Sequence, residues 1–276
     1  MITETKQIAT ETKQLEISKK KEFIFEINAA LMRKVVNSLT CFQDECIFSI
    51  TADGIFFLQV CPAHVSMVKM LLSKQDMIRY PYENDMEFGV DLESLSKFLS
   101  KSMYSNEQVL VMFFEENKTH LNQGDYRETS STLKIEDFNR PKFPTIHKNG
   151  EFDIFPLREF IYGVEFTSEI SDHTVLKLMK DTRHLFLISE WEDVRRHFDV
   201  SGNMVGSVVC EGNPKRPDHV RTIIPSEYLL YLFKNLPSEE NAKIFIDNDY
   251  PIRIEQNFGK ASTVTYLCAP RIESED

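Results

Sequence analysis

YLCAPRIE, at residues 266–273, is an apolar, strand-like segment that runs directly into a proline and an acidic end. Proline cannot continue a sheet because it lacks an N–H, so we expect the strand to end at the surface with its edge and tail open. Two other segments carry compact apolar patterns: residues 54–68, from GI to HVSMV, and residues 89–99, GVDLESLSKFL. The chain of 276 residues is long enough for one large or two medium domains, each with its own core.

The charge balance argues against nucleic-acid binding by bulk electrostatics. With 32 Lys and Arg against 43 Asp and Glu, the net charge is −11. A nucleic-acid role would therefore require basic residues gathered on one surface.

The cysteines predict reduced thiols inside a cell. No Cys-x-x-Cys, zinc-site spacing or secretory leader accompanies them, so we expect no metal. The apolar runs are shorter than the ~20 residues of a membrane helix, which predicts a soluble protein without a membrane partner. The five cysteines are Cys41, Cys46, Cys61, Cys210 and Cys268.

The first twenty residues differ from the rest. TETKQ at residues 3–7 recurs at residues 10–14, and two copies are too few for a coiled coil. Residues 1–20 are therefore interpreted as a mobile, polar extension, with a partner-binding helix as the alternative.

From residue 21 onward, the chain shows one arrangement twice. Helices are expected at residues 29–39 and 92–101 in the first half, and at 156–166 and 225–235 in the second, from their apolar spacing. The repeat predicts an α+β fold of two similar halves, each with two helices on a mostly antiparallel sheet. Strands are expected at residues 23–27, 46–50, 55–60, 64–72, 109–114, 132–135, 151–155, 174–179, 184–189, 195–200, 205–210, 242–247, 251–256 and 263–268.

The segment 136–150 contains two prolines and an Asn-Gly pair, so it must cross the surface without regular structure. It is either a plain domain linker or a wall of a docking groove that exposes Phe143.

No residue pattern recommends catalysis. His64 lacks an accompanying nucleophile motif, and a structural or surface role fits it better. The pairs Asp172-His173 and Asp218-His219 look like acid–base couples, but neighbours on a strand point to opposite faces, so neither is expected to form a dyad. No glycine-rich phosphate loop is present. We therefore expect no enzyme and no cofactor.

Basic side chains fall on the polar faces of the expected helices. In an acidic protein they would form a positive stripe that suits a phosphate backbone. Ordinary solvated helix faces are the alternative. These residues are Arg33, Lys34, Lys97, Lys101 and Lys234.

Across residues 21–276, the three segments quoted first occur in the order found in DNA sliding clamps, and the chain resembles the proliferating cell nuclear antigen (PCNA) family. The resemblance implies the DNA-clamp fold, in which two-domain subunits assemble into a closed ring whose helices line a hole for duplex DNA. Such a ring performs no chemistry. It acts as a DNA polymerase processivity factor and tethers replication and repair proteins through a groove under the interdomain linker.

The resemblance also implies a division of the chain: a clamp domain at residues 21–135, a connecting loop at 136–150 and a second clamp domain at 151–276. The ring would close through exposed sheet edges, for which residues 127–135 and 200–211 are the candidates. Expected partners are double-stranded DNA, a DNA polymerase, a clamp loader and other clients, with a homotrimer or a heterotrimer as the assembly. The location would be nuclear in a eukaryote, and otherwise cytoplasmic or at viral replication sites.

Matched to the family position by position, the pore-facing cations are Arg33, Lys34, Lys97 and Lys234. Tyr162, Glu165 and Glu227 stand where the family commonly has basic residues. A subunit of the heterotrimeric checkpoint clamp would explain these carboxylates, and an enzyme acting on nucleic acid is the rival of another class.

Cys61-Pro62 replaces an Asp-containing turn at the rim of the docking groove, so the rim is expected to differ. The implied groove residues are Val60, His64, Val65, Phe143, Pro144, Pro251, Leu267, Ala269 and Pro270.

Overall fold

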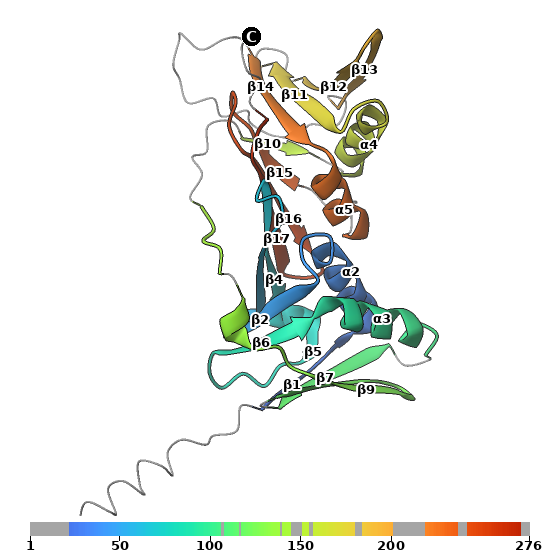
Figure 1. Ribbon diagram of the computed structural model, residues 1–276, viewed down its shortest axis with the longest axis vertical. Helices are drawn as coiled ribbons and strands as arrows, with labels where there is room; N and C mark the ends of the chain where they lie inside the picture. The colour runs from blue at the N-terminus through green and yellow to red at the C-terminus, as the bar shows by residue number, and fades with distance from the viewer. Residues whose placement is uncertain are drawn as a thin grey trace, which may run out of the picture.

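The described part of the chain forms three antiparallel sheets and four helices, and the helices lie together against one face of the sheets (Figure 1). The computed structural model describes residues 22–105, 108–115, 117–138, 140–144, 151–154, 157–179, 184–200, 219–236 and 242–271. The predicted extension at residues 1–20, the strand at 205–210 and the Asp218 side chain lie outside these residues.

The largest sheet has eight strands and contains segments of both halves of the chain. Its central pair is β17 (Ser262–Cys268) and β4 (Ser66–Ser73), which run antiparallel with Leu267 opposite Met67. A single ladder thus joins the first half to the second. The other strands, in sheet order around this pair, are β10 (Glu151–Ile154), β15 (Ala242–Phe245) and β16 (Ile252–Phe258) on the β17 side, and β3 (Gly54–Val60), β2 (Glu45–Thr51) and β6 (Met86–Asp91) on the β4 side.

Each half completes its fold with a smaller sheet. The first half has five strands in the order β5-β1-β7-β8-β9: Met77–Arg79, Phe23–Asn28, Val109–Glu115, Lys118–Gln123 and Tyr126–Ser131. The second half has four described strands in the order β13-β12-β11-β14: Val194–Asp199, Leu185–Trp191, His173–Met179 and His219–Pro225.

Four helices form a layer on the sheets, with α2 beside α3 and α5, and α4 beside α5. Asn28 caps α2 by accepting from the Ala30 and Leu31 N–H groups, and Asp91 caps α3 by accepting from Ser94 N–H. Two short 3₁₀ turns, η1 (Lys74–Asp76) and η2 (Ile135–Asp137), occur between strands. The helices are α2 (Ala29–Leu39), α3 (Leu92–Ser102), α4 (Leu157–Ser168) and α5 (Glu227–Asn235).

Helical spacing identified the buried faces of the first two helices. In α2, the apolar residues Val35, Val36 and Leu39 are fully buried, and Leu31 packs partly buried against the core. In α3, the buried apolar residues are Leu92, Leu95, Phe98 and Leu99. The α+β prediction is confirmed.

The strand expected at residues 132–135 is wrong. The polar hairpin of β8 and β9 occupies residues 118–131 instead, and only Leu133 then makes an isolated bridge, to Gly89. The two backbones touch there, because a Cβ on Gly89 would lie 2.6 Å from the Leu133 carbonyl oxygen. Strand β14 was also not anticipated.

Asp76 links the two halves a second time. Its carboxylate accepts from the Ser262 hydroxyl at 2.7 Å and from the N–H groups of Ala261 and Ser262 at 3.0 Å each. Partial burial opposes the ionised form, but these hydrogen bonds and one from Lys260 N–H outweigh burial and lower the pKa of Asp76.

We expect Asp76→Asn to lower the free energy of unfolding by about 1 kcal/mol at neutral pH, because charge-assisted hydrogen bonds are weakened. A depressed folded-state pKa contributes stability above the unfolded pKa of about 3.9, and this stability is lost as pH falls through the folded pKa. Urea titrations should therefore show the gap between wild type and variant shrinking at a pH of about 3. A gap of equal size at both pH values would contradict a role for the charge.

Candidate functional site

The exposed face of the helix layer carries the predicted basic residues of the first half. Lys34 on α2 and Lys97 and Lys101 on α3 are exposed. Arg33 is half-buried, and its Nε donates to the Leu99 carbonyl oxygen at 3.1 Å, which ties α2 to α3. The structure thus gathers four cations on two adjacent helices.

The same face is less basic than the cations alone suggest. Lys97 Nζ lies 2.7 Å from Glu93 Oε1, and this hydrogen bond raises the pKa of Lys97. In the second half, Lys234 shares a cavity of about 570 Å³ with Glu165 and Glu227, which lie on α4 and α5. Positive charge is therefore concentrated on α2 and α3.

A second site is an apolar groove of about 150 Å³ at the junction of the two halves. It contains all the predicted groove residues except Phe143 and Pro270. Its lining is Val60, His64, Val65, Ser66, Met67, Pro144, Pro251, Leu267, Cys268 and Ala269.

Phe143 lies next to the groove, where it packs with Leu58, Val60 and Tyr250 on the buried pair Met67 and Leu267. Lys69 Nζ makes a cation–π contact with the Phe143 ring, at 5.5 Å from the ring centroid. Pro270 does not line the groove. Sequence reasoning missed Ser66, Met67 and Cys268, because only the register of β4 on β17 shows that these residues meet.

The loop between β3 and β4 forms one rim of the groove. Ala269 N–H donates to the Val65 carbonyl oxygen at 2.7 Å, and His64 N–H donates to the Cys61 carbonyl oxygen at 2.9 Å. His64 has a φ of 56°, in the left-handed region that suits glycine. The strand expected to begin at His64 therefore begins at Ser66.

The Cys61 side chain stabilises this rim through a hydrogen bond. Its Sγ accepts from Ser66 N–H at 3.3 Å, so the sulfur does what a carboxylate oxygen could do in an Asp-containing turn. Burial raises the pKa of the thiol, but hydrogen bonds from Ser66, Val65 and Tyr228 outweigh burial and lower the pKa of Cys61.

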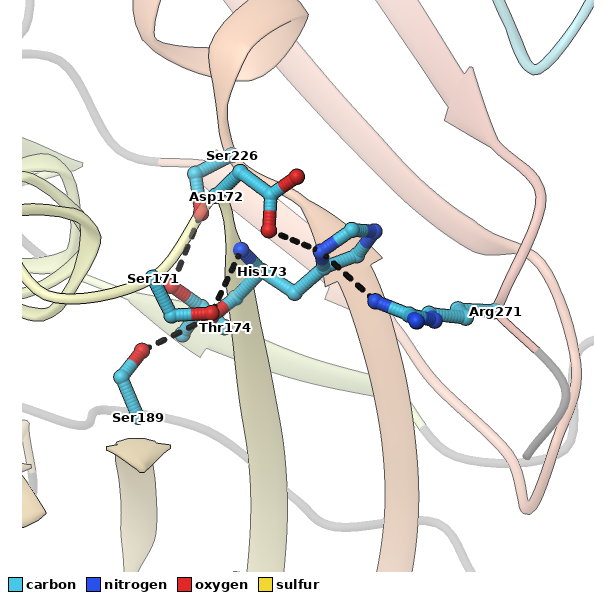
Figure 2. Close-up of polar contacts among 7 residues, drawn as sticks. All are labelled: Ser171, Asp172, His173, Thr174, Ser189, Ser226 and Arg271. Carbon is cyan, nitrogen blue, oxygen red and sulfur yellow. Dashed lines mark hydrogen bonds and ion pairs between the residues drawn. The ribbon is translucent and has the colours of Figure 1, made fainter. Parts of the chain in front are cut away.

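Asp172 and His173 do form a pair, which corrects the sequence-based expectation. Asp172 precedes β11, so the alternation of strand side chains does not separate the two residues. Their Oδ1 and Nδ1 atoms are 2.5 Å apart (Figure 2). Within the described chain, no serine or cysteine side chain bonds to the His173 ring, whose other partner is Arg271.

The described ranges contain no group of three His, Cys, Asp or Glu side chains placed to hold a metal ion. Nor does any described helix have the length and apolar character needed to cross a membrane.

The chain is similar in sequence to known DNA sliding clamps. The family model for the N-terminal domain of proliferating cell nuclear antigen matches residues 23–140. A DNA polymerase sliding clamp of Methanococcus maripaludis strain C7 is 26% identical over 258 residues, which cover 90% of this chain and 98% of the relative. That of Methanocella arvoryzae is 28% identical over 251 residues, with the same two coverages. These similarities support a sliding clamp of the PCNA family.

Solved structures of PCNA share the fold. A. fulgidus PCNA, bound to the C-terminal region of FEN-1, matches with a TM-score of 0.80 at 19% identity, covering 92% of this chain and 100% of that one. Thermococcus kodakaraensis PCNA matches with a TM-score of 0.74 at 19% identity, covering 91% and 99%. The predicted clamp fold and its sliding-clamp function, that of a polymerase processivity factor, are confirmed, and these relatives do not favour the checkpoint clamp.

The left-handed backbone of His64 gives a stability prediction. We expect His64→Gly to keep the free energy of unfolding or raise it by up to about 1 kcal/mol, since glycine adopts this φ without strain. His64→Val should lower it by about 1–3 kcal/mol, since a β-branched residue at positive φ is strongly strained. Guanidinium titrations decide the matter. A valine variant as stable as the glycine variant would show that the rim conformation imposes no such constraint.

Proposed function

We propose that three copies of this chain close into a ring around duplex DNA, with the helix layer facing the DNA. The observation that carries this proposal is the position of all four helices on one side of the sheets, with the exposed cations of α2 and α3 on their outer face. In this arrangement, residues 21–135 and 151–276 are the two clamp domains of each subunit, and residues 136–150 connect them.

A sparse set of cations suits a ring that slides. Neutralising many phosphates gives tight binding that falls steeply with salt, whereas enclosure retains DNA without a high contact energy. The net charge of −11 repels DNA elsewhere on the protein. Glu165 and Glu227 loosen the contact further at α4 and α5.

Two sheet ends would close the ring. Strand β9 is the outer strand of the five-stranded sheet and covers most of the predicted edge at residues 127–135. The predicted edge at residues 200–211 lies largely outside the described residues. Among the described strands, β13 is the outer strand of the four-stranded sheet at this end. With one edge at each end, subunits can associate head to tail. Such a chain of subunits closes into a ring when the rotation between neighbouring subunits is a whole fraction of a turn.

The groove would dock peptides of client proteins such as a polymerase and a clamp loader. Its apolar walls suit aromatic or aliphatic anchors, whose affinity comes from filling a desolvated pocket. The related A. fulgidus protein binding the C-terminal region of FEN-1 supports this role. The ring itself would tether enzymes and perform no reaction, in the nucleus of a eukaryote and otherwise in the cytoplasm or at viral replication sites.

The threading proposal predicts that the charge of the helix face controls function. Changing Lys34 and Lys97 together to Glu should shorten the products of a clamp-dependent polymerase by roughly three- to tenfold at moderate salt, through lost phosphate contacts. Both side chains are exposed, so thermal unfolding should change little. Lys260→Glu, an exposed reversal on the turn between β16 and β17, is the matched control. Product lengths equal to the control would contradict the proposal.

The docking proposal predicts a role for Phe143. We expect Phe143→Ala to weaken the binding of a client peptide, one with an aromatic pair on a helical turn, by about 1–3 kcal/mol, as when other interface anchors are truncated. Ile78→Ala, which shortens an apolar side chain that is 58% exposed on β5, should leave the affinity unchanged. Calorimetric titration measures both. Equal loss in the two variants, or loss in neither, would place the client elsewhere.

A further inference from the structure

A cavity of about 580 Å³ lies on the four-stranded sheet of the second half and shares no lining residue with the groove. Alternation along β11 separates two faces: Thr174, Leu176 and Leu178 are buried, while Val175 and Lys177 line the cavity. The Thr174 hydroxyl meets that of Thr167 on α4, so the buried face is the helix side. The cavity therefore opens on the sheet face opposite the helices.

The lining of this cavity is basic, although the protein is acidic. Four cations, Lys177, Arg195, Arg221 and Arg271, face two carboxylates, Asp172 and Glu190. Both carboxylates are engaged: Glu190 Oε1 lies 2.9 Å from Arg195 Nε, and Asp172 contacts His173. The cavity thus holds a surplus of positive charge.

Lys177 stands opposite Arg221 in the pairing of β11 with β14. Like charges in this position repel, and a bound anion removes the repulsion. Arg221 has contacts of its own, and its backbone N–H donates to Asn248 Oδ1 at 2.8 Å. The ammonium group of Lys177 makes no hydrogen bond or ion pair with any residue that the structure describes.

Arg271 has donors available for a ligand. Its guanidinium lies 3.1 Å from His173 Nδ1, the same nitrogen that is 2.5 Å from Asp172 Oδ1 (Figure 2). One ring nitrogen cannot donate to Asp172 and accept from Arg271 at once. The ring therefore takes at most one N–H of the Arg271 guanidinium, and the other N–H groups of the guanidinium have the fork geometry that suits an oxyanion.

Apolar groups make the cavity more than an ion site. Val175, Ile188 and Ile223 contribute to its lining, and Trp191, 62% exposed, stands at its margin. Tryptophan and arginine are the residue types that most often dominate protein–protein binding energy. The volume falls in the range that binds small ligands or a few peptide residues.

We propose that this cavity is a second docking site, which takes an acidic segment of a partner protein with carboxylates on Lys177 and Arg271 and apolar side chains between them. A continuous phosphate chain fits less well, because Asp172 and Glu190 lie in its path and the apolar lining would have no partner. The site lies outside the path that DNA takes in the proposed ring, and its occupation does not depend on ring closure.

The test is fluorescence anisotropy of the full chain with a labelled peptide of sequence Glu-Leu-Glu-Glu-Leu-Glu. The same peptide with glutamine in place of glutamate is the neutral control. We expect the acidic peptide alone to bind, and Lys177→Glu together with Arg271→Gln to weaken it roughly tenfold or more. Lys260→Glu changes the net charge outside the cavity and should leave the affinity within about twofold. Melting curves establish that the variants remain folded.

Three results would overturn the proposal. The first is an acidic peptide that does not bind, or that binds the double variant as well as the parent. The second is a single-stranded oligothymidylate that displaces the peptide and loses its own binding in the double variant, which would assign the cavity to nucleic acid. The third is a gain in peptide affinity on deletion of residues 272–276, which would make the chain's own acidic end the occupant.

Discussion

The pairing of β17 with β4 is the interaction on which the rest of the molecule depends. It joins segments almost 200 residues apart into one ladder, so that a single sheet holds both halves. The buried Tyr266 and the contact of Leu267 with Met67 lie on this ladder. Because the groove is lined from β3, β4 and β17, it exists only when the ladder has formed. A client peptide that binds in the groove therefore binds only chains in which the two halves are paired.

The same ladder determines how the helices of the two halves are placed next to each other. It brings α2 against α5, where Asn235 Nδ2 donates to the Asn37 carbonyl oxygen at 3.3 Å. The four helices thereby form one continuous face from α3 to α4, although its charge is uneven. Cations gather on α2 and α3, and carboxylates accompany Lys234 on α5. A ring built from this face would hold DNA unevenly along its circumference, with the first half of each subunit making the stronger contact.

Local pattern and family resemblance predicted much of this arrangement, for reasons that are visible in the structure. The helices follow from apolar spacing, and the groove residues were implied by the family resemblance. The β8–β9 hairpin escaped prediction because residues 118–131 are mostly polar, with Leu121 as the buried aliphatic member. The Asp172–His173 contact escaped prediction because both residues were treated as neighbours on a strand, whereas Asp172 precedes β11. The basic cavity draws on all four strands of its sheet, which no local pattern can reveal.

The claim that this chain builds a ring is tested most directly by electron microscopy of the purified protein at micromolar concentration. The account predicts closed particles with a central opening, each with a mass of three chains of 32.2 kDa. Their inner wall should be formed by the helix layer, and their outer wall by the sheets that carry the groove and the basic cavity. A field of single two-lobed particles with no opening, persisting as concentration rises, would contradict it.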